Sequence, residues 1–202
     1  PIACEGCGVC AWFCPSEAVA FAPAVNGEYF VSQTRYGPMV HARLGIAEEN
    51  SGKLVSTVRR EAAELIQTCG LELILVDGSP GIGCPVIASI TGADLVLIVT
   101  EPTLSGLHDL GRVADVAKHF KIPAMVCVNK WDLNPEMTEQ IERESCDRGM
   151  TLVGRVRYDR AVTKAQVQKQ TVVEYQTDGC AQDIRDVWTR IEATLEHGNT
   201  GE

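Results

Sequence analysis

Residues 124–132 read AMVCVNKWD, and this stretch decides the fold class. Its first five residues form an unbroken apolar run, which is typical of a strand buried on both faces of a parallel sheet. Three polar residues follow closely: Asn129, Lys130 and Asp132. In α/β proteins the carboxyl ends of such strands carry the ligand sites. We therefore expect a buried strand with a candidate site directly after it.

Similar apolar runs recur along the chain, with helical patterns between them. The predicted strands cover residues 73–76, 94–100, 124–128 and, more weakly, 151–156. The predicted helices cover residues 85–91, 107–120, 135–148 and about 182–195. Strands that alternate with helices indicate an α/β protein whose parallel sheet is covered on both faces.

The segment before this pattern does not alternate strands with helices. Two strand-like runs, residues 29–34 and 39–44, flank Tyr36-Gly37-Pro38, which is typical of a turn. A polar stretch then leads into residues 53–69, where apolar side chains recur at helical spacing. We expect a hairpin followed by one long helix.

Composition excludes several classes of protein. The 202 residues are 45% hydrophobic, enough for one medium domain and a small appended one. The net charge of −9 would repel phosphate backbones, so we expect no nucleic-acid partner. No apolar run approaches the roughly 18 residues of a membrane span. Nine cysteines, an odd number, fit a reducing compartment, and we expect a cytoplasmic protein.

The first cysteines form a dense motif. Residues 4–15 read CEGCGVCAWFCP, the spacing with which bacterial ferredoxins bind [4Fe–4S] clusters. A zinc site is the weaker alternative, because zinc modules separate two cysteine pairs by roughly a dozen or more residues. The predicted metal ligands are Cys4, Cys7, Cys10 and Cys14. In two-cluster ferredoxins the fourth cysteine ligates the other cluster, so Cys14 serves either the same cubane or a second one.

Residues 76–85 read VDGSPGIGCP, an acid after an apolar run and then a glycine-rich turn. This is the Walker B pattern, in which the carboxylate holds Mg²⁺ through water and the glycines let backbone approach a γ-phosphate. The alternative is a strand end whose loop has no function. The sequence contains no G-x-x-x-x-G-K-[ST] phosphate loop. Residues 51–54, SGKL, follow a polar stretch and fit a helix start capped by Ser51 better.

The motif at residues 129–132 has the chemistry of a nucleotide-base reader. The Asn129 amide carries both a donor and an acceptor, which suits a purine edge. Lys130 and Asp132 complete an N-K-x-D pattern. The alternative is a turn closed by an Asx hydrogen bond. The position after a buried strand favours the nucleotide hypothesis.

Together these motifs resemble the C-terminal portion of MinD-superfamily P-loop ATPases that contain an inserted ferredoxin domain. The resemblance rests on residues 4–14, 48–55, 77–85, 100–103, 106–110 and 129–130. It implies an α/β core with the parallel sheet of a P-loop NTPase-like fold. Within that fold, the resemblance is to the deviant Walker type, which includes the nitrogenase iron protein. Residues 1–24 would be a partial ferredoxin-like iron–sulfur segment, and residues 25–196 an incomplete ATPase core. The first strand and the phosphate loop are expected before Pro1.

The resemblance also implies site roles. Asp77 would be the Mg²⁺-linked acid and Gly81 the switch glycine that senses γ-phosphate. Asn129 would contact adenine. Asp132 would suit guanine, so ATP over GTP rests on the resemblance. Tyr158-Asp159 fall where family members close the base pocket, but Arg157 replaces the proline often found there.

The implied function is ATP hydrolysis with Mg²⁺, coupled to electron transfer through one or two [4Fe–4S] clusters. The full-length protein is expected to be a homodimer that meets a redox partner protein, and this chain alone to be inactive. The alternative is an iron–sulfur carrier or scaffold that uses nucleotide to gate cluster release to an acceptor.

Overall fold

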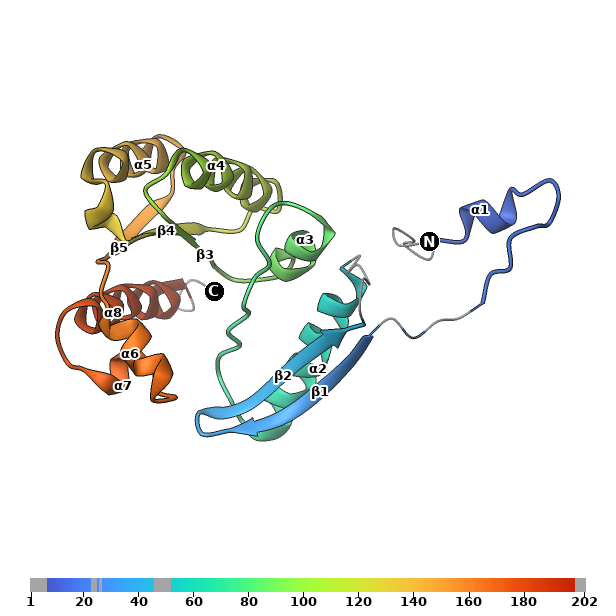
Figure 1. Ribbon diagram of the computed structural model, residues 1–202, viewed down its shortest axis with the longest axis horizontal. Helices are drawn as coiled ribbons and strands as arrows, with labels where there is room; N and C mark the ends of the chain where they lie inside the picture. Colours follow the sequence, from blue (N-terminus) through green and yellow to red (C-terminus); the bar gives the residue numbers. More distant parts are fainter. Residues whose placement is uncertain (1–6, 23–24, 26, 46–51, 199–202) are drawn as a thin grey trace. The chain divides into compact units, whose positions relative to one another are not determined.

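The computed structural model describes residues 7–22, 25, 27–45 and 52–198 (Figure 1). Contacts between residues divide the chain into two compact units, residues 1–91 and residues 92–202. The first unit contains the hairpin and the long helix predicted from sequence. The second contains the parallel sheet.

The hairpin of the first unit consists of β1 (Gly27–Thr34) and β2 (Gly37–Leu44), paired antiparallel. The predicted strands are confirmed, and each begins two residues earlier than expected. The turn is closed by Thr34, whose hydroxyl donates to the Gly37 carbonyl at 2.7 Å and accepts the Tyr36 N–H at 3.1 Å. Gly37 has a φ of 126°, a region that side chains with a Cβ rarely adopt.

The long helix α2 covers Lys53–Cys69, as predicted. Its N-cap position is Gly52, with a left-handed φ of 89°; Ser51, the cap expected from sequence, lies outside the described residues. A Cβ at Gly52 would stand only 2.8 Å from the Cys84 carbonyl oxygen. Glycine is therefore needed both for the backbone conformation and for close packing.

Helix α3 (Cys84–Ile90) is joined to α2 at two places. At its start, the Cys84 backbone lies against Gly52. At its end, the Arg59 guanidinium donates to the Ala88 carbonyl at 2.8 Å and also to the Thr91 carbonyl. These carbonyls have no partner within their own helix, so Arg59 satisfies acceptors that would otherwise need water.

The predicted strand at residues 73–76 is wrong. Within the described residues, 71–79 form no strand, and β3–β5 pair only with one another. Leu73 is 50% exposed and Leu75 82% exposed. A strand requires a neighbour that pairs with its backbone N–H and C=O groups, and apolar composition cannot supply one. The segment instead borders a hollow of about 540 Å³, whose other walls include β2 and α2.

The sheet of the second unit contains three parallel strands in the order β3-β4-β5. They are β3 (Val96–Thr100), β4 (Ala124–Asn129) and β5 (Thr151–Val156). The predictions at 94–100, 124–128 and 151–156 are confirmed, as is the parallel arrangement. The predicted α/β fold is therefore present in this unit.

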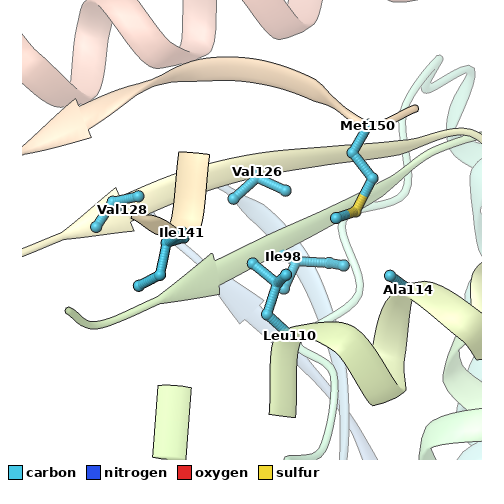
Figure 2. Close-up of a cluster of buried hydrophobic side chains, with 7 residues drawn as sticks. All are labelled: Ile98, Leu110, Ala114, Val126, Val128, Ile141 and Met150. Carbon is cyan, nitrogen blue, oxygen red and sulfur yellow. The ribbon is translucent and has the colours of Figure 1, made fainter. Parts of the chain in front are cut away.

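Helices cover both faces of this sheet (Figure 1). On one face lie α4 (Leu104–His119) and α5 (Pro135–Asp147), and on the other lies α8 (Cys180–Gly198). Side chains of β4 alternate between the faces, as a strand's geometry requires. Val126 and Val128 join the core with α4 and α5, which Figure 2 shows. Met125 and Cys127 pack toward α8.

Two short helices after β5 were not predicted: α6 (Ala161–Val167) and α7 (Val172–Tyr175). Helix α7 has only four residues and depends on a capping box. The Thr171 hydroxyl accepts the Glu174 N–H, and the Glu174 carboxylate accepts the Thr171 N–H at 2.7 Å. Among the described residues, no helix combines the length and the apolar character needed to cross a membrane.

Candidate functional site

The loops that follow β3, β4 and β5 emerge at one edge of the sheet. Because the strands are parallel and adjacent, their carboxyl ends lie side by side: Thr100 pairs with Val128, and Asn129 with Val156. The loop after β4 contains the predicted Asn129, Lys130 and Asp132. The structure therefore brings this whole motif to the sheet edge where α/β proteins bind ligands.

Asn129 is the last residue of β4 and is partly buried. Its backbone belongs to the sheet through its pairing with Val156. The hydrogen bonds found among the described residues include none from its side-chain amide. A donor and an acceptor are thus offered together at the site.

Lys130 points along the edge toward the loop after β3. Its Nζ lies 2.6 Å from Oε1 of Glu101. The Lys130 side chain is 37% exposed and that of Glu101 47%, and such a pair contributes at most about 1 kcal/mol. Lys130 has a left-handed φ of 56°, which turns the chain from β4 into the 3-10 turn Trp131–Leu133. The ion pair holds the first two loops of the edge together.

Asp132, in this turn, contacts the third loop. Its Oδ1 accepts the backbone N–H of Tyr158 at 2.7 Å. The turn is also held from below by Thr138, a fully buried residue whose hydroxyl donates to the Trp131 and Asn134 carbonyls at 3.0 Å each. The turn is therefore fixed on two sides.

Arg157, the first residue after β5, forms a fork with Asp183 of α8. Its Nε lies 2.7 Å from Oδ2 and its Nη2 lies 2.8 Å from Oδ1. The Arg157 backbone N–H, which proline would lack, donates to Oδ2 at 3.1 Å. The Arg157 guanidinium, and to a smaller extent the Arg157 N–H, holds the pKa of Asp183 below its ordinary value. The Asp183 carboxylate in turn raises the pKa of Arg157.

Asp159 fixes the far end of the same loop. Its Oδ1 accepts the Ala161 N–H at 2.8 Å, and its Oδ2 accepts from Gln176 at 2.9 Å. The Ala161 N–H, and then the Gln176 amide, lower the pKa of Asp159. The carboxylate therefore stays ionised and keeps both bonds at neutral pH.

Sequence reasoning assigned no role to Glu101, Asp183 or Gln176. Each meets its partner across a long separation in the chain, for example 29 residues between Glu101 and Lys130. Only Asp183 left a local sign, an acid in the first turn of a helix.

The two predicted catalytic residues, Asp77 and Gly81, belong to the first unit. Asp77 is exposed and follows the irregular segment 71–76. Gly81 has a left-handed φ of 87°, and a Cβ built there meets no atom within 4 Å. The backbone of this loop is thus open and adopts a conformation that favours glycine.

The cysteine segment forms one short helix, α1 (Val9–Trp12), which starts after Gly8 in a left-handed conformation. Cys7 and Cys10 are exposed. Cys14 Sγ accepts the Ala18 N–H at 3.3 Å, and this bond, with a second from the Ser16 N–H, lowers the pKa of the Cys14 thiol. Backbone N–H groups aimed at sulfur also suit a thiolate ligand of an iron–sulfur cluster.

The fourth predicted ligand, Cys4, lies outside the described residues. The described part of the chain holds no group of three or more His, Cys, Asp or Glu side chains placed to bind a metal. The iron–sulfur centre therefore stays a prediction from the motif.

No family model matches the sequence. Two uncharacterized proteins of Methanocaldococcus jannaschii are similar to it. One is 31% identical over 97 residues, which are 48% of this chain and 34% of the relative. The other is 27% identical over 131 residues, 65% of this chain and 46% of the relative. The matches thus span less than half the length of these curated relatives.

Solved structures share the fold at low sequence identity. The MinD cell division protein of Aquifex aeolicus superposes with a TM-score of 0.61 at 19% identity, covering 81% of this chain and 68% of that one. The septum site-determining protein MinD of Pyrococcus horikoshii, complexed with Mg-ADP, gives 0.58 at 15%, covering 74% and 59%. A ParA family ATPase of Chlorobium tepidum gives 0.51 at 20%, covering 70% and 57%. The chain therefore has the α/β fold of the MinD and ParA ATPases.

Proposed function

We propose that this chain is part of an ATPase that binds ATP and Mg²⁺ at the carboxyl edge of the parallel sheet. The observation that carries the proposal is the Asn129 amide, which ends β4 at this edge and makes no hydrogen bond to the described residues. The MinD protein of the same fold that holds Mg-ADP supports it. Asn129 would contact adenine, while Asp77 and Gly81 would act at Mg²⁺ and the γ-phosphate.

The iron–sulfur part of the proposal concerns residues 1–24, with residues 25–196 as the ATPase core. The ligands would be Cys4, Cys7, Cys10 and Cys14, and a bound cluster would supply one-electron transfer. The backbone N–H groups at Cys14 support this choice because they stabilise a thiolate. Nucleotide binding would then alter the docking of a redox partner to a cytoplasmic homodimer.

Nucleotide binding is tested by calorimetric titration of the full-length protein with ATP in the presence of Mg²⁺. We expect Asn129→Ala to weaken ATP binding by about tenfold or more, because an amide paired to an adenine edge contributes about 1–3 kcal/mol. Gln166→Ala removes an exposed side-chain amide on α6 and should leave the affinity unchanged. Equal affinities of wild type and Asn129→Ala would contradict the assignment.

The exposure of Cys7 and Cys10 favours the second candidate, a nucleotide-gated cluster carrier, because an acceptor protein can reach exposed ligands. Anaerobic reconstitution followed by iron counting and electron paramagnetic resonance separates the two functions. Electron transfer predicts reversible reduction with the iron retained. A carrier predicts that iron passes to an apo-acceptor when nucleotide is added.

A further inference from the structure

Two residues of the N-K-x-D motif are already engaged with the protein. To read guanine, a carboxylate has to accept both the N1–H and the N2–H of the base, one on each oxygen. One oxygen of the Asp132 carboxylate, Oδ1, already accepts the Tyr158 N–H at 2.7 Å, which fixes the carboxylate against this loop. The Lys130 ammonium is paired with Glu101, with Nζ 2.6 Å from Oε1. Of the three polar residues in the motif, Asn129 is left with its full hydrogen-bonding capacity toward a base.

The loop that Asp132 contacts is held by carboxylates from three parts of the second unit. Asp132 binds the Tyr158 N–H, and Asp183 binds Arg157 through three hydrogen bonds. Asp159 closes the loop on Ala161. All three contacts include backbone N–H groups, so they fix the path of the main chain itself. The Tyr158 ring remains 50% exposed on this fixed loop.

We propose that Asp132 is a positioning residue: it holds the Tyr158 loop as a wall of the base pocket, and Asn129 reads the base. This inference rests on the proposed nucleotide function. It assigns to Asp132 a role opposite to the one that the N-K-x-D pattern suggests.

Two substitutions separate positioning from base reading. Asp132→Asn keeps a carbonyl oxygen for the Tyr158 N–H, whereas Asp132→Leu has a similar volume and no acceptor. A positioning role predicts that Asp132→Asn binds ATP as wild type does, and that Asp132→Leu binds it about fivefold more weakly. Wild type should prefer ATP to GTP. Asp147→Leu, an exposed acid at the end of α5, is the matched control and should bind normally.

A base-reading role predicts a different pattern. Asp132→Asn would then lose GTP binding and gain binding of xanthosine triphosphate, because the amide presents a donor where the carboxylate presented an acceptor. That result would overturn the inference. The proposed function fails separately, if wild type does not bind ATP.

Amide hydrogen exchange of Tyr158 tests positioning without any nucleotide. The Tyr158 N–H should be protected in wild type and in Asp132→Asn, and should exchange at least about fivefold faster in Asp132→Leu. Unchanged protection in Asp132→Leu would overturn the inference whatever the nucleotide titrations show.

Discussion

Two apolar runs of similar composition, residues 73–76 and residues 124–128, have different structures. The second is β4, at the centre of the sheet, where Val126 is fully buried. The first forms no strand in the described structure, and its Leu75 is 82% exposed. The difference lies in the neighbours: β4 has β3 on one side and β5 on the other. An apolar run indicates where a chain gains from burial, but a strand forms only where partners pair with its backbone.

The most direct test of this difference in burial is to place the same charge in both runs. Val126→Asp should cost more than about 4 kcal/mol, because it buries an unpaired carboxylate. Leu75→Asp should change the free energy of unfolding by less than about 0.5 kcal/mol, because the side chain is exposed. Urea denaturation followed by circular dichroism measures both. A large cost for Leu75→Asp would show that residues 73–76 are buried in solution.

The two units can also be compared through glycine, with Gly106 in the first turn of α4 and Gly81 in the loop after residues 73–76. In the second unit, a Cβ at Gly106 would stand only 2.8 Å from Thr100 Oγ1 and would also clash with the Glu101 carbonyl oxygen. Gly106→Ala should therefore cost about 2–3 kcal/mol by overpacking. Gly81→Ala meets no atom and should cost about 1 kcal/mol, from its left-handed backbone alone. Thermal unfolding ranks the two variants, and the reverse order would contradict the open loop described for residues 77–83.

The smallest effect concerns the carboxylates at the edge of the sheet. The folded-state pKa of Asp183 lies below its unfolded value, so its stabilising contribution is complete above about pH 4 and is lost as the pH falls through the folded pKa. Asp183→Asn should cost about 1 kcal/mol at neutral pH. The cost should shrink as wild type loses the same interaction in acid. Unfolding free energies of both proteins between pH 7 and 3 measure this, and a cost independent of pH would exclude the charged fork as its source.

The sequence predicted the second unit well because its strands carry continuous apolar runs and its long helices carry periodic ones. It also placed Asn129, Lys130 and Asp132 at one sheet edge, since all three follow β4 directly. It missed α6 and α7, which have only seven and four residues, too few for a periodic pattern to show. It also missed Glu101 and Asp183, whose partners are distant in the chain, so only pairing across space reveals them.

The double attachment between α2 and α3 has a mechanical consequence. Gly52 lies against Cys84 at the start of α3, and Arg59 binds the Ala88 and Thr91 carbonyls at its end. Because both ends of α3 contact α2, we expect the two helices to move together. A shift in residues 77–83 that displaced Cys84 would therefore press on Gly52 at the start of α2, whose 17 residues extend about 25 Å from that point.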